Sequence, residues 1–236
     1  MEQRRRVFPP FTSALSRTET VLVLLWLPVH ILLLPWLLRL AYDRGLISVL
    51  WVNVAYYAIG FVYMLLAGFR FLRRDFDALI DHPLLVTGQA AGGYLSILAF
   101  NMLAALLIAR FAPGAVNLNQ SGVEELVDVS VGPMKAALVY LGPLTEEMMF
   151  RAGLFSALRK RNRLLAYAVS ILAFSVYHVW GYAVQDPSYW IFLLQYLPAG
   201  WLLARCYERT NTIWGSVFCH MLNNAMALAL TRAMPG

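Results

Sequence analysis

The chain has 236 residues, of which 60% are hydrophobic and only 14% are charged. A soluble domain carries about 25% charged residues, so this composition argues against a soluble enzyme, a disordered chain or a disulfide-rich secreted scaffold. The net charge of +6 calls for no nucleic-acid partner, because membrane proteins collect Lys and Arg in their cytoplasmic loops.

Seven segments are long and apolar enough to cross a bilayer, which takes about 20 residues. In chain order they are residues 20–42, 46–69, 84–111, 132–157, 164–183, 188–206 and 211–231. We therefore expect an all-α, polytopic membrane helix bundle of about seven transmembrane helices. The sizeable loop, residues 112–131, is expected to be a solvated connector, with substrate gating as the alternative.

The basic residues divide unequally between the two sides that these spans define. Thirteen of the 19 fall in the N-terminal segment and in the loops after the second, fourth and sixth spans. The positive-inside rule then places the N-terminus in the cytoplasm and the C-terminus outside. A multi-pass protein of the bacterial inner membrane is the expected location.

Polar groups that are costly inside a bilayer concentrate in three of the last four spans. An isolated histidine in the first span, His30, is expected to be packed or interfacial. The later groups are Glu146, Glu147 and Arg151 in the fourth span, Phe174 and His178 in the fifth, and His220 and Asn224 in the seventh. The 1.5 Å rise per residue puts the ionisable groups near the middle of each span, so all could meet in one cavity.

Helical geometry separates the two glutamates. Glu147 and Arg151 are four residues apart, so they share a helix face and can pair. Glu146 points about 100° away and is free to face the cavity, where a carboxylate could accept a proton from water.

The other two motifs also have a spacing of four residues. His220 and Asn224 project together and could donate hydrogen bonds to a developing oxyanion. Phe174 shares a face with His178 and is expected to pack against it and orient it rather than react.

The three motifs together resemble the CPBP family of intramembrane proteases, also called Abi or CAAX-protease-and-bacteriocin-processing proteins, which includes the type II CAAX prenyl endopeptidases. Its pattern is EExxxR on one transmembrane helix, FxxxH on a second and HxxxN or HxxxB on a third, and this chain carries all three in order. The resemblance covers roughly residues 130–230. It divides the chain into N-terminal helices with an outer loop, residues 1–130, and a CPBP-like catalytic helical core, residues 131–236.

The resemblance implies an intramembrane endopeptidase acting on a membrane-associated protein or peptide, of prenylated CAAX type or a precursor peptide. By motif position, the implied roles are water activation for Glu146 and His178, oxyanion stabilisation for His220 and Asn224, and electrostatic support for Glu147 and Arg151. We favour metal-free chemistry because HExxH is absent from the sequence. The alternative is zinc held by Glu146, His178 and His220.

Two functions of other classes stay open at this level. Intramembrane Glu, His and Arg also mark transporters and proton relays, although the inverted repeats common in such proteins are not evident here. A non-catalytic immunity or scaffold protein could use the same residues as a structural polar network.

Overall fold

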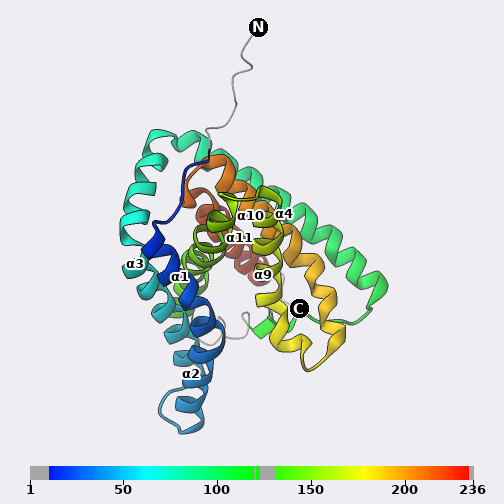
Figure 1. Ribbon diagram of the computed structural model, residues 1–236. Coiled ribbons are helices and arrows are strands. Elements are labelled where there is room, and N and C mark those ends of the chain that lie inside the picture. Colours follow the sequence, from blue (N-terminus) through cyan, green and yellow to red (C-terminus); the bar gives the residue numbers. More distant parts are fainter. Residues whose placement is uncertain (1–10, 120, 123–130, 234–236) are drawn as a thin grey trace.

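The fold is an all-α bundle, which confirms the predicted fold class (Figure 1). The computed structural model describes residues 11–119, 121–122 and 131–233, and no strand occurs within them. Residues 123–130 of the predicted outer loop lie outside the described residues.

The first half of the chain forms three long rods. The first is α1 (Arg17–Pro28), η1 (Val29–Leu33) and α2 (Leu34–Asp43), the second is α3 (Val49–Asp81) and the third is α4 (Pro83–Phe111). A capping box fixes the start of α1, because the Ser16 side chain accepts from the Glu19 backbone N–H and the Glu19 carboxylate accepts from the Ser16 backbone N–H. The π-helical turn η1 lies between Pro28 and Pro35, neither of which can donate a backbone hydrogen bond.

The second half supplies four more rods. The first, which we call the central rod, is made of α6 (Val131–Ala136), η2 (Ala137–Leu141), α7 (Gly142–Glu147), η3 (Met148–Phe155) and α8 (Ser156–Arg159). The other three are α9 (Arg163–Ala183), η4 (Pro187–Phe192) with α10 (Leu193–Thr210), and α11 (Ile213–Ala233). Both η2 and η3 are π-helical.

Each predicted span corresponds to one of these rods, but the rods are of two kinds. Among the described residues, five helices are long and apolar enough to cross a membrane: 17–43, 49–81, 83–111, 163–183 and 213–230. Of the other two, the central rod buries most of its residues within the bundle, and η4–α10 buries a smaller share, including Gly200, Leu203 and Tyr207. A buried helix needs no continuous lipid-facing surface, so its composition can include charges.

The second span is longer than predicted. Its helix was expected to end near residue 69 and to be followed by a basic loop, but α3 continues to Asp81, so Arg70, Arg73 and Arg74 are helical. The extension stays helical because it is amphipathic: Phe71 is buried while the arginines around it face outward.

The middle of the central rod, residues 142–153, is buried at every position. It contacts α1 and α3 on one side and α9 and α11 on the other, and α4 packs across α10 and α11 (Figure 1). The main hydrophobic core lies around it and includes Met148, Met149 and Phe150. The helices α9 and α11, which carry the other two motifs, therefore both pack against the central rod.

Side-chain hydrogen bonds join the ends of several rods near the N-terminus. Asp75 of α3 accepts from the Ser13 hydroxyl at 2.7 Å and from the backbone N–H of Ile213, the first residue of α11. The Tyr207 hydroxyl donates to the Ser13 carbonyl at 2.8 Å. Asp75 thus caps α11 and fixes its height beside the central rod, two turns before His220.

Candidate active site

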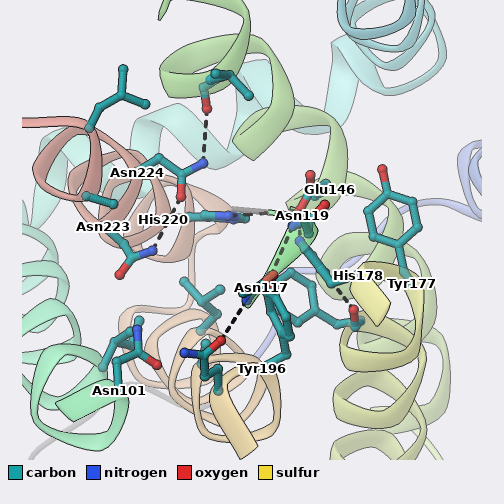
Figure 2. Close-up of a pocket in the computed structure, with 18 of the residues that line it drawn as sticks. Asn101, Asn117, Asn119, Glu146, Tyr177, His178, Tyr196, His220, Asn223 and Asn224 are labelled. Atoms are coloured by element: carbon teal, nitrogen blue, oxygen red, sulfur yellow. Dashed lines mark hydrogen bonds and ion pairs between the residues drawn. The ribbon is translucent and has the colours of Figure 1, made fainter. Parts of the chain in front are cut away.

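A cavity of about 720 Å³ opens beside the central rod, within the size range of ligand-binding pockets. Its walls come from η1–α2, α3, α4, α7, α9, α10 and α11 and from the segment after α4. The motif residues among its lining are Glu146, Phe174, His178, His220 and Asn224. Figure 2 shows Glu146, His178 and His220 grouped in the cavity.

The Glu146 carboxylate is the point on which the two histidines converge. Its Oε2 lies 3.5 Å from His178 Nε2 and 3.9 Å from His220 Nε2, and it makes no hydrogen bond to any residue that the structure describes. The Glu146 side chain is 10% exposed and reaches the cavity. Three helices therefore bring together a carboxylate and two imidazoles, as the spacing of the motifs predicted.

One nitrogen of the His178 ring is hydrogen-bonded to the backbone. Its Nδ1 lies 2.8 Å from the Phe174 carbonyl oxygen, one helical turn earlier. A carbonyl only accepts, so Nδ1 carries the proton. In the neutral ring, Nε2 then presents its lone pair to Glu146, and the two groups face each other as acceptors.

Glu147 serves two partners at once. Its Oε2 lies 3.2 Å from Arg151 Nε, which is the predicted i,i+4 pair, and its Oε1 lies 3.0 Å from His220 Nδ1. Both Glu147 and Arg151 are fully buried. The second contact was not predicted, because it joins two helices and no spacing within one helix reveals it.

Phe174 lies among the charged groups and packs against them. The Arg151 guanidinium carbon is 4.3 Å from the centre of its ring, and the rings of His178 and His220 are 4.5 and 5.9 Å away. The guanidinium also donates to the carbonyl of Gly200 at 3.3 Å. This placement agrees with the packing role expected for Phe174.

Asn224 braces the rod that carries Glu146. Its Nδ2 donates to the Leu138 carbonyl at 3.0 Å. Because the N–H of Gly142 bonds to Ala137 in the π-helical turn, the next partner for Leu138 would be residue 143, a proline without an N–H. Asn224 therefore supplies the donor that Pro143 lacks.

The structure adds cavity residues that the motifs did not indicate. Tyr196 of α10 stacks on His178, with ring centres 4.6 Å apart and 21° between planes. Asn117 and Asn119, in the segment after α4, donate to the Tyr196 hydroxyl at 3.3 and 3.0 Å. Single polar residues outside a periodic pattern gave no signal in the sequence.

His30 is packed, as expected. It is 1% exposed and stacks on Tyr56 with ring centres 4.3 Å apart. The Tyr56 hydroxyl in turn lies 2.8 Å from that of Tyr177, and both tyrosines line the cavity. His30 thus supports the cavity wall from behind.

A catalytic zinc site needs three protein ligands gathered around one point. Within the described ranges, no group of three His, Cys, Asp or Glu side chains is placed to hold a metal ion. The bond from His220 Nδ1 to Glu147 leaves Nε2 as the nitrogen that faces Glu146. As placed, these side chains do not form a three-ligand metal site.

Comparisons with known proteins find a family model and a curated relative that are similar to this chain. A family model described as type II CAAX prenyl endopeptidase Rce1-like matches residues 130–226. YdiL of Bacillus subtilis (strain 168), named as a proposed membrane peptidase, is 26% identical over 141 residues. That alignment covers 59% of this chain and 54% of the relative, so the chain spans about half the length of the curated relative it matches. No solved structure matches.

The helices that pass through the bilayer make this an integral membrane protein. The segment matched by the family model contains Glu146, His178 and His220, which meet in the cavity. Residues 130–226, with all three motifs, are therefore similar to the Rce1-like type II CAAX prenyl endopeptidases, which supports the resemblance to the CPBP family drawn from the motifs.

Proposed function

We propose that this protein is an intramembrane endopeptidase that hydrolyses a peptide bond of a membrane-associated protein or peptide, of prenylated CAAX type or a precursor. The observation that carries the proposal is the convergence of Glu146, His178 and His220 at one cavity inside an apolar bundle. An acid–base pair beside a hydrogen-bond donor is the minimum equipment for adding water to an amide.

Glu146 and His178 activate the water. Their facing acceptor atoms, 3.5 Å apart, can both receive hydrogen bonds from one water that enters from the cavity. Glu146 takes a proton as the water oxygen attacks the carbonyl carbon, and returns it to the amide nitrogen as the C–N bond breaks. One water is consumed, and a carboxyl and an amine terminus are formed.

His220 stabilises the oxyanion of the tetrahedral intermediate. To donate from Nε2 while Nδ1 is bonded to Glu147, the ring must carry both protons. Glu147 is placed to balance that charge: with His220 protonated, two carboxylates face one guanidinium and one imidazolium, and the site is neutral overall. The second amide hydrogen of Asn224 assists from the cavity wall.

The chemistry is proposed to be metal-free. A carboxylate with two imidazoles suffices for water activation and oxyanion binding in the steps above. We expect hydrolysis to survive exhaustive chelation; its loss on chelation and recovery with added zinc would establish the alternative.

We further propose that the N-terminus is cytoplasmic, in a bacterial inner membrane. Arg74 contacts the backbone of the N-terminal segment at Ala14, and Arg159 and Arg163 bind Glu208 at the same end of the bundle. Clustering of the basic loops at one end favours that end as the cytoplasmic side.

The test compares membranes from cells that carry the wild type or Glu146→Gln, by mass spectrometry of protein termini. We expect an uncleaved precursor to accumulate only with the Glu146 variant. Glu19→Gln is the matched control, because Glu19 and Glu146, each taken as a whole residue, are both 8% exposed but Glu19 does not line the cavity. Identical termini in all three samples, for a variant that is folded and present, would refute the proposed reaction.

A further inference from the structure

The outer wall of the cavity carries a polar cluster that the three motifs do not include. We call it the outer-wall cluster; its members are Asn117, Asn119, Tyr189, Gln195 and Tyr196. Four of the five line the cavity, and Tyr189 does not. Figure 2 shows Asn117, Asn119 and Tyr196 together below Glu146.

Hydrogen-bond directions within the cluster can be assigned one by one. The backbone N–H of Asn119 donates to the Tyr189 hydroxyl at 3.0 Å, so that hydroxyl donates its own hydrogen to Asn117 Oδ1 at 2.8 Å. With Oδ1 accepting, the Asn117 side chain donates only from Nδ2. That nitrogen is 2.7 Å from Gln195 Oε1 and 3.3 Å from the Tyr196 hydroxyl.

The Tyr196 hydroxyl therefore accepts twice. Asn117 and Asn119 both donate to its oxygen, which fills both of its acceptor positions. Within the described part of the chain, the hydrogen of this hydroxyl has no acceptor. Accepting two hydrogen bonds polarises an O–H group and makes it a better donor.

The position of Tyr196 makes this donor relevant to the reaction. Its ring stacks on the His178 imidazole, and it lines the same cavity as Glu146. A peptide that enters an apolar bundle must unwind at the bond to be cut, which frees main-chain carbonyls. Each unpaired carbonyl costs several kcal/mol inside a membrane unless the protein supplies a donor.

We propose that the outer-wall cluster is a substrate subsite, in which the Tyr196 hydroxyl donates a hydrogen bond to a main-chain carbonyl of the extended peptide beside the bond that is cut. Asn117 and Asn119 are positioning residues, which hold the hydroxyl with its hydrogen toward the cavity. The inference rests on the proposed function, and it gives the segment after α4 a part in substrate binding.

The test uses Tyr196→Phe, which removes the hydroxyl and keeps the ring on His178. Binding is measured by fluorescence anisotropy of a labelled, farnesylated CAAX peptide in the Glu146→Gln protein, with and without Tyr196→Phe. Cleavage of the same peptide, internally quenched, is measured in the protein with Glu146 intact. We expect Tyr196→Phe to weaken binding and to lower kcat/KM by about tenfold, the usual effect of losing one neutral hydrogen bond.

Tyr189→Phe is the matched control. It removes a hydroxyl from the same cluster, one that donates to Asn117 but does not line the cavity. We expect Tyr189→Phe to lower thermal stability more than peptide affinity. In the same Glu146→Gln protein, Asn119→Ala should weaken binding when Tyr196 is intact and add little to Tyr196→Phe, because both act through one hydroxyl.

The outcomes separate the two proposals. Unchanged peptide affinity and kcat/KM in Tyr196→Phe, or equal losses in Tyr189→Phe, overturn the subsite. Tyr196-dependent binding without any cleavage by the wild type supports the subsite and counts against the proposed hydrolysis.

Discussion

The shared carboxylate of Glu147 offers the sharpest test of how the site is held together. Glu147→Gln keeps the shape of the side chain and an oxygen that can accept from His220, but it removes the charge opposite Arg151. The Arg151 guanidinium is fully buried and would be left with the Gly200 carbonyl and the Phe174 ring as partners.

The expected loss follows from that burial. Removing one partner of a buried ion pair costs about 3–5 kcal/mol, because the remaining charge stays desolvated. For a chain of this size, each kcal/mol corresponds to roughly 2–4 °C, so the melting temperature should fall by about 6–20 °C. Replacing both members, as in Glu147→Gln with Arg151→Met, should recover most of this loss, since no unpaired charge remains.

The two cysteines provide the assay. Cys206 and Cys219, the only cysteines of the chain, are free and buried. A thiol-reactive dye in detergent micelles therefore reports unfolding as these thiols become accessible. If Glu147→Gln melts at the wild-type temperature, or the double variant melts lower than either single one, Arg151 does not depend on this ion pair.

Three further predictions concern other parts of the bundle. Burial raises the pKa of the Glu208 carboxyl, but hydrogen bonds from Arg163, Tyr167 and Arg159 outweigh burial and lower the pKa to about 2. The carboxylate should therefore contribute its full stabilisation above pH 4.5, its ordinary pKa, and lose it as the pH falls toward 2. Between pH 7 and pH 3, the melting temperature of Glu208→Gln should depend less on pH than that of the wild type. Gly93→Ala places a Cβ 2.8 Å from the Cys219 sulfur and should destabilise the α4–α11 contact by about 1–3 kcal/mol. Adding Cys219→Ala should relieve this clash. Size-exclusion chromatography after heating checks both effects through the fraction of protein that stays unaggregated. Asn224→Ala should lower the melting temperature as well as activity, because the Leu138 carbonyl loses its donor; a stability equal to wild type would leave Asn224 with a purely chemical role.

Much of the fold was predictable because a bilayer imposes a simple length rule. The seven predicted spans lie on seven helical rods, since each apolar run had to cover the same thickness. The end of α3 was misplaced because the segment from Arg70 to Asp81 is amphipathic rather than apolar, and a hydropathy criterion stops where lipid contact stops.

Only those features of the site that follow from the position of a residue along its helix could be predicted from the sequence. The Glu147–Arg151 pair follows from a separation of four residues, and convergence of Glu146 with the histidines follows from depth in the bilayer. Contacts between helices that are set by rotation about the helix axis, such as His220 with Glu147, have no signature in one sequence. The same holds for contributions from a connecting segment, such as Asn119 with Tyr196.

The burial of the central rod also has a consequence for how the protein enters the membrane. A helix that carries Glu146, Glu147 and Arg151 would cost several kcal/mol for each charge if it were inserted alone into lipid. Pairing of Glu147 with Arg151 within one helix lowers that cost before any other helix arrives. Contacts with α1 and α3, which precede the central rod in the chain and pack against it in the finished bundle, lower the cost of inserting these charges further. We therefore expect the N-terminal helices to receive the central rod during biosynthesis, and chains shortened from the N-terminus to fail at integration into the membrane rather than at catalysis.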